Sequence, residues 1–127
     1  MSPMKAVVLK SLGGPERLET VELPMPKPAA DEIIIKVSWA GVNFIDVSMR
    51  TGAYGQSRTY PSQLPMTLGM EGAGTVEAVG EGVTDVAVGQ PVAYCLARGS
   101  YAQYARVPAW RVVPVPLMVK PRLLKSL

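Results

Sequence analysis

Glycine and proline are spread along the whole chain, with twelve of each among 127 residues. Both residue types interrupt helices and favour tight turns, so a long helix has little room in this sequence. The apolar runs between these breaks are only as long as strands, as in Ala6–Leu9 and Ile33–Ile35. A chain of this length forms about one domain. The pattern therefore predicts a small, mainly β domain of short strands joined by turns.

The strands and one helix can be placed from periodicity and turn residues. We expect strands at Met4–Leu9, Leu18–Leu23, Glu32–Val42, Glu71–Val79, Val92–Leu96, Ser100–Val107 and Arg111–Val115. A short helix is expected over Asn43–Arg50, with Asn43 as its N-cap and Gly52 just past its end. Residues 53–65 are loop-like. Closely spaced short strands with one helix favour a partly open β-barrel.

Histidine is absent, and Cys95 is the only cysteine. These counts exclude Ser-His-Asp and Cys-His catalysis, a His-ligated metal, a CxxC redox pair and an internal disulfide. Cys95 follows apolar residues in an expected strand, so we expect a buried, inert thiol. We find no signal peptide and no apolar run long enough to span a membrane, and therefore expect a soluble cytoplasmic protein without a membrane partner.

Charge is distributed unevenly. Residues 1–85 carry seven basic and ten acidic side chains, whereas residues 86–127 carry six basic side chains and none that is acidic. One interpretation is a basic face for an anionic cofactor or a nucleic acid. Because the six cations are scattered, we favour a solvated surface and expect no nucleic-acid partner.

No loop of the kind that cradles phosphate groups is present. Gly72-Ala-Gly74 and Gly80-Glu-Gly82 each lack the third glycine of a GxGxxG fingerprint, and neither opens a convincing helix. The chain by itself is therefore not expected to bind a dinucleotide tightly.

Six short motifs occur in order: Lys5-Ala-Val-Val, Gly41-Val-Asn-Phe-Ile-Asp46, Gly69-Met-Glu-Gly-Ala-Gly74, Val79-Gly-Glu-Gly-Val83, Gly89 and Gly99-Ser-Tyr-Ala-Gln-Tyr104. Together they resemble the N-terminal, GroES-like catalytic domain of the medium-chain dehydrogenases/reductases, and most closely the zeta-crystallin-like NADPH:quinone oxidoreductases. The resemblance covers about residues 4–116. It implies a mainly β, GroES-like, partly open barrel with one or two short helices over residues 1–116. An atypical, truncated tail over residues 117–127 would stand where relatives continue into a Rossmann domain.

The resemblance also separates this chain from the zinc enzymes of the superfamily. Those enzymes carry a cysteine where this chain has Asn43 and a His-Glu pair where it has Met70-Glu71. Zinc needs three or four soft or borderline ligands, and an amide with a thioether does not provide them, so no metal is expected. We expect Glu71, beside the empty metal position, to be held by a cation that the sequence does not identify. The resemblance implies NADPH as cofactor and a quinone or related enone as substrate, because a quinone accepts hydride without a Lewis acid.

The resemblance implies Asn43 and Tyr54 as catalytic residues that donate a hydrogen bond to the developing oxyanion. It implies Asn43, Ser48, Tyr54 and Met66 as cofactor contacts, with Ser48 replacing a tyrosine that is common in the family. For several of these residues, a purely structural role is the alternative to a role in the site. Asn43 and Asp46 match a helix-capping box, and for Asp46 we favour the structural role. Tyr54 could pack on the surface, and Met66 and Met70 could fill the core or the wall of the cleft.

Two functional hypotheses follow. The first is the substrate-side domain of a zinc-independent, NADPH-dependent quinone reductase, truncated and inactive alone. The alternative is a stand-alone GroES-like binding module or a non-catalytic remnant. A truncated barrel would expose apolar surface that the absent domain otherwise covers, and we expect this surface to favour self-association.

Overall fold

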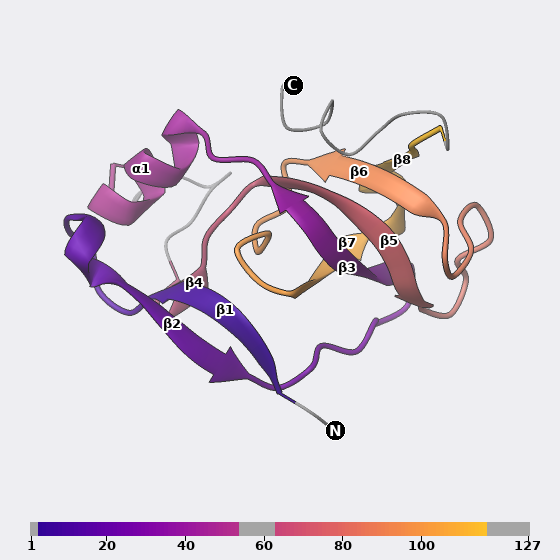
Figure 1. The fold of residues 1–127 in the computed structure, drawn as a ribbon, viewed down its shortest axis with the longest axis horizontal. Helices are drawn as coiled ribbons and strands as arrows, with labels where there is room; N and C mark the ends of the chain where they lie inside the picture. Colours follow the sequence, from indigo (N-terminus) through magenta and orange to yellow (C-terminus); the bar gives the residue numbers. More distant parts are fainter. Residues whose placement is uncertain (1–2, 54–62, 117–127) are drawn as a thin grey trace.

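The structure is a computed structural model, and it describes residues 3–53 and 63–116. The elements run in the order β1 (Met4–Leu9), the 3-10 turn η1 (Pro15–Arg17), β2 (Leu18–Leu23), β3 (Glu32–Ala40), α1 (Phe44–Thr51), β4 (Met66–Thr67), β5 (Glu71–Val79), β6 (Pro91–Cys95), β7 (Tyr104–Pro108), the 3-10 turn η2 (Ala109–Arg111) and β8 (Val112–Pro114) (Figure 1). The mainly β fold with one short α-helix is confirmed. The expected tail, residues 117–127, lies outside the described residues.

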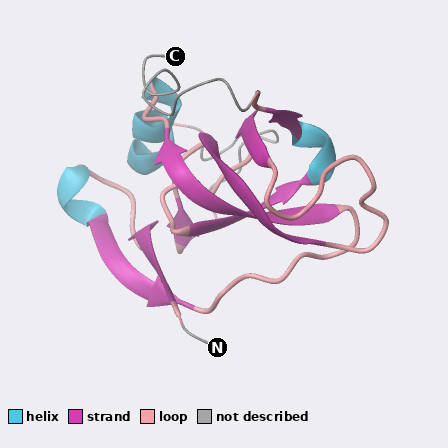
Figure 2. Ribbon diagram, turned by 45° about the vertical axis from the view of Figure 1, so that its right-hand side comes forward, coloured by secondary structure: helices cyan, strands magenta, loops and turns pink. Residues whose placement is uncertain are grey.

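The strands form two antiparallel sheets. The smaller sheet has the order β2-β1-β4, and the larger has the order β7-β3-β5-β6-β8. In Figure 2 the smaller sheet lies at the lower left and the larger sheet to its right, and Figure 1 shows α1 on the same side of the molecule as the smaller sheet. Within the described ranges, no helix is long and apolar enough to cross a membrane.

Residues 101–103 connect the two sheets along a seam. The Val7 N–H donates to the Tyr101 carbonyl at 2.8 Å, and the Gln103 N–H donates to the Lys5 carbonyl at 3.0 Å. The next residue, Tyr104, begins β7, which pairs with β3 in the larger sheet. One continuous stretch of backbone therefore lies along the part of β1 that β4 does not pair with, and then enters the second sheet, which partly closes the barrel.

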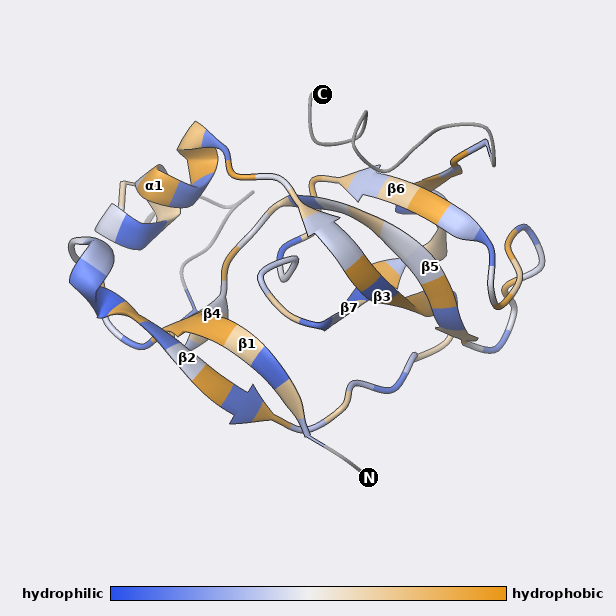
Figure 3. Cartoon of the chain, in the orientation of Figure 1, coloured by the Kyte–Doolittle hydropathy of each residue, from blue (hydrophilic) through white to orange (hydrophobic). Residues whose placement is uncertain are grey.

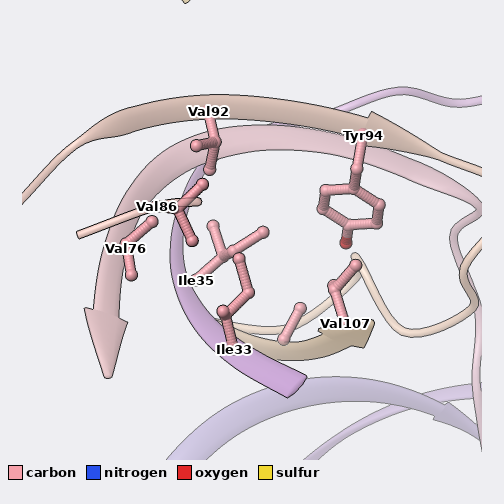
Figure 4. Close-up of a cluster of buried hydrophobic side chains, with 8 residues drawn as sticks. Ile33, Ile35, Val76, Val86, Val92, Tyr94 and Val107 are labelled. Carbon is pink, nitrogen blue, oxygen red and sulfur yellow. The ribbon is translucent and has the colours of Figure 1, made fainter. Parts of the chain in front are cut away.

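The main core lies against the larger sheet. Its buried members are Ile33, Ile35, Val76, Val86, Val92, Tyr94, Ala105 and Val107 (Figure 4). Ile34, between the two core isoleucines, is also buried, so β3 is covered on both faces at this point. Figure 3 shows the same apolar stretch along the centre of the sheet. Burial on two faces explains why a short apolar run here specifies a central strand.

A second cluster joins α1 to the smaller sheet. It contains Leu9, Met49, Met66, Leu68 and Met70, all buried. Three of the five are methionines, whose flexible side chains fill the irregular space between a helix and a strand edge. This cluster fixes the helix against β1 and β4, and thereby places the start of the helix.

Several boundaries differ from the sequence prediction. The strand expected to start at Ser100 starts at Tyr104, because Ser100 and Tyr101 direct their N–H groups to the carbonyls of Gly69 and Leu68 instead of to a neighbouring strand. The strand expected to end at Val42 ends at Ala40. The two-residue strand β4 was not predicted, since two residues carry no periodicity.

The expectation that Cys95 is buried is wrong, because its thiol is exposed. Strand β6 alternates strictly, with Val92 and Tyr94 pointing into the core. Cys95 therefore points outward at the end of the strand.

Candidate functional site

Three strand ends meet at one end of the larger sheet. Ala40 at the end of β3 pairs with Gly72 in β5, and the Gly41 N–H donates to the Glu71 carbonyl at 3.1 Å. Glu71 in turn pairs with Cys95 at the end of β6. The sheet register thus brings the chain just before Asn43 next to Met70-Glu71. Residues that are 30 positions apart in sequence form one local surface.

Asn43 caps the helix that follows this sheet end. Its backbone is extended, and α1 then runs until Gly52, which adopts the left-handed conformation with φ +90°. The Asn43 N–H donates to Oδ2 of Asp46 at 2.9 Å, which is one half of a capping box. The predicted helix, its N-cap and its C-terminal glycine are confirmed. The capping role of Asn43 does not occupy its side-chain amide as a donor, so the catalytic hypothesis stays open.

Asp46 is the buried centre of this region. Only 4% of its surface is exposed, and its Oδ2 also accepts a hydrogen bond from the Tyr101 hydroxyl at 2.7 Å. Its other oxygen, Oδ1, is buried and has no hydrogen-bond partner within residues 3–53 and 63–116. The structural role favoured for Asp46 agrees with these contacts. Tyr101 was not among the predicted site residues, although it lies in the Gly99–Tyr104 motif.

The other predicted contacts occupy different surroundings. Ser48 lies half-buried in the middle of α1, and its carbonyl accepts the Ala53 N–H at 2.9 Å. Met66 is buried in β4, in the same apolar cluster as Met70. Tyr54 lies outside the described residues.

The Glu71 side chain packs directly against Gly41, where a Cβ atom would overlap it. We expected a cation to hold this carboxylate. The ion pairs found in the described ranges are Lys10–Glu19 and Arg106–Glu32, and neither involves Glu71.

The donors at this sheet end do not fit a zinc ion. Met70 is 5% exposed and its side chain packs in the apolar cluster, while Asn43 offers an uncharged amide. Across residues 3–53 and 63–116, no three His, Cys, Asp or Glu side chains come together as a metal site would require.

A separate cavity of about 530 Å³ opens at the seam between the two sheets. Its lining comes from the start of β1, the Pro26 connector, residues 63–67, and residues 98, 99, 102 and 104–106. Arg98 and Arg106 line it, and the Arg98 guanidinium lies 3.5 Å from the Met66 sulfur. Of the predicted site residues described, Met66 lines this cavity, whereas Asn43 and Ser48 do not.

Two partly or fully buried tyrosines, Tyr94 and Tyr101, are expected to make the stability of the fold decrease at alkaline pH. Burial raises the pKa of Tyr94, with the nearby Ser100 hydroxyl opposing it in part. Burial also raises the pKa of Tyr101, and the hydrogen bond to Asp46 adds to this. Unfolded tyrosines lose their protons from about pH 10, so the unfolded chain binds fewer protons above that pH. Stability should be intact below pH 10 and decrease as the pH rises further.

Urea unfolding measured between pH 8 and 11.5 checks this expectation, with tyrosine ionisation followed at 295 nm. Tyr94→Phe and Tyr101→Phe should each reduce the alkaline loss of stability. Stability that stays constant across this range would contradict the assignment.

Comparison with known proteins gives the family. The model for the alcohol dehydrogenase GroES-like domain matches residues 29–117. A probable quinone oxidoreductase from Schizosaccharomyces pombe is 41% identical over 110 residues, covering 86% of this chain and 32% of that protein. The chain spans about one third of the length of such curated relatives.

Solved structures agree with this assignment. The Escherichia coli quinone oxidoreductase complexed with NADPH superposes with a TM-score of 0.84 at 34% identity, over 91% of this chain and 34% of that one. A cobalt- and zinc-bound alcohol dehydrogenase from Pyrobaculum aerophilum superposes with a TM-score of 0.80 at 30% identity, over 94% and 43%. The sequence match and the shared fold place this chain in the GroES-like domain family of the medium-chain dehydrogenases/reductases.

Proposed function

We propose that residues 1–116 form the substrate-side domain of a zinc-independent oxidoreductase that transfers hydride from NADPH to a quinone or a related enone. The observation that carries the proposal is the sheet end at Asn43. An amide begins the helix there, and a buried thioether stands at Met70, the two positions where a zinc enzyme needs a thiolate and an imidazole. The similarity to quinone oxidoreductases supports the same conclusion.

The residues around Asn43 suit a flat, uncharged ring. Val42 and Phe44, on either side of it, are 79% and 82% exposed, while Asn43 is half-buried. Apolar side chains beside one amide donor can contact a nicotinamide or quinone ring by its face and by one oxygen. Ser48, in the same helix, is smaller than the tyrosine common in the family and leaves more room.

NADPH, when bound, supplies the hydride. The chemical task left to this domain is to align the acceptor and to stabilise the negative charge that develops on its oxygen. The side-chain amide of Asn43 would donate a hydrogen bond to that oxygen, with the Tyr54 hydroxyl as a second donor. Ser48 and Met66 are proposed cofactor contacts. Because the 127 residues contain no glycine-rich phosphate loop, the phosphates would be held by a separate dinucleotide-binding domain.

The test is kinetic and uses a form of the protein extended by a dinucleotide-binding domain, with NADPH and menadione as substrates. Asn43→Asp keeps a good helix N-cap but removes the N–H donors, so the free energy of unfolding should change by about 1 kcal/mol or less. The loss of an oxyanion donor should lower kcat/KM about 100-fold or more. Tyr54→Phe should also lower kcat/KM.

If Asn43→Ala and Tyr54→Phe both leave kcat/KM unchanged, the site assignment is wrong. The 127-residue chain assayed alone is the control, and it should oxidise no NADPH above the blank rate. Turnover by this chain alone would contradict the requirement for a second domain.

A further inference from the structure

We propose that Tyr101 is a positioning residue for Asn43 and acts on it through Asp46. The proposal rests on the function proposed above, because it assigns a support to the same amide donor. Tyr101 lies 55 positions from Asp46 in the sequence, in the seam between the two sheets.

The link is a single shared oxygen atom. Oδ2 of Asp46 accepts the Asn43 N–H at 2.9 Å and the Tyr101 O–H at 2.7 Å. The carboxylate is 4% exposed, so water cannot easily replace either donor. Its second oxygen has no hydrogen-bond partner among the residues that the structure describes, and the two donors on Oδ2 therefore orient the carboxylate there.

The Tyr101 backbone is fixed independently of the helix. Its N–H donates to the Leu68 carbonyl at 3.0 Å, and its carbonyl accepts the Val7 N–H at 2.8 Å. Gly69, with φ +97°, makes room for this stretch, because a Cβ there would overlap Ser100 and Tyr101. The phenol is thus anchored to β1 and to the segment that leads into β5.

The opposite end of α1 is anchored separately. Arg50 donates to the Gly13 carbonyl at 2.8 Å and accepts the Gly13 N–H at 3.0 Å through its own carbonyl. The helix is therefore held at its last turn by Arg50 and at its first turn by Asp46. Without the Tyr101 hydroxyl, the first turn loses its bond to the seam, and Asn43 is held by the cap alone.

The experiment compares two tyrosine-to-phenylalanine variants of the 127-residue chain by ¹H–¹⁵N NMR. Tyr94→Phe is the matched control, because the Tyr94 hydroxyl is also buried, but no hydrogen bond found within residues 3–53 and 63–116 joins it to Asp46 or Asn43. In Tyr101→Phe, the backbone amide signal of Asn43 should shift, and its hydrogen exchange should become about five- to tenfold faster. In Tyr94→Phe, both should stay as in the parent chain.

A second measurement keeps the side chain intact. Replacing the tyrosines by 3-fluorotyrosine strengthens the phenol as a donor with little change of shape, and the Asn43 amide signal should shift again. If Tyr101→Phe does not fold, the 3-fluorotyrosine measurement tests the link between Tyr101 and Asn43 by itself. In the extended form of the protein, Tyr101→Phe should lower kcat about tenfold and leave the KM for NADPH nearly unchanged.

An Asn43 amide that is insensitive to both changes would overturn the proposal, whether or not Asn43 serves the reaction. The opposite failure looks different. If the Asn43 amide signal responds but turnover does not depend on Asn43, the Tyr101–Asp46–Asn43 link is supported and the proposed function is wrong. The two failures are therefore distinguishable.

Discussion

Replacing Gly74 by alanine is expected to destabilise the domain by about 3 kcal/mol or to prevent folding. Gly74 pairs with Val37 where the register between β3 and β5 shifts, and a Cβ there would meet the backbone carbonyl of Lys36. A backbone oxygen cannot move aside as a side chain can. The strands cannot separate either, because β3 is buried on both faces at Ile33–Ile35. Urea unfolding followed by circular dichroism measures the loss.

Gly89→Ala is the matched control for this steric argument. Gly89 has φ +90°, but its Cβ would meet no atom within 4 Å. Only the strain of a left-handed residue applies there, at about 1 kcal/mol. If Gly74→Ala costs no more than Gly89→Ala, the close approach of β5 to β3 does not control stability.

Removing the Asp46 carboxylate should have a similarly large effect. Asp46→Ala leaves the Asn43 N–H and the Tyr101 O–H buried without an acceptor, at about 1–3 kcal/mol each. A loss of about 3 kcal/mol corresponds to a decrease in Tm of about 10 °C for a domain of this size. Scanning calorimetry of the purified chain provides the measurement.

Asp85→Ala is the control for that substitution, because Asp85 is exposed and its described side-chain hydrogen bond is a 3.5 Å contact with Thr84. Its Tm should change little. Equal effects of Asp46→Ala and Asp85→Ala would show that the buried carboxylate contributes nothing specific.

Much of the fold is readable from local patterns. Strands Met4–Leu9, Leu18–Leu23 and Glu71–Val79 have the predicted bounds, because each combines apolar or β-branched residues with clear turn residues at its ends. The helix was predicted from its cap and its C-terminal glycine. These signals lie within a few residues of the structure that they specify.

The parts that could not be predicted depend on long-range contacts. The hydrogen bond between Asp46 and Tyr101 spans 55 positions, and no local pattern pairs them. Residues 101–103 were predicted as part of a strand. Their backbone instead forms hydrogen bonds with β1 and with Leu68, just before Gly69. The exposure of Cys95 was predictable, since strict alternation from Val92 gives its direction.

The candidate site also has a part that local sequence predicts and a part that depends on long-range contacts. Placing Asn43 at the start of a helix required only its neighbours, whereas placing the chain just before it next to Glu71 required the register of β3 and β5. The grouping of Met66 with Met70 in one cluster also follows from packing, not from spacing.

The seam at residues 101–103 is the place where the smaller sheet and the larger sheet can separate from each other. Outside that stretch, the strands of each sheet hydrogen-bond mainly to one another, so the seam is suited to open locally while both ladders stay paired. Breaking the hydrogen bonds of residues 101–103 would move Tyr101 away from α1 before any strand of the core is lost. The geometry around Asn43 would then be among the first features to disappear on mild heating, well below the temperature at which the β3–β5 ladder melts.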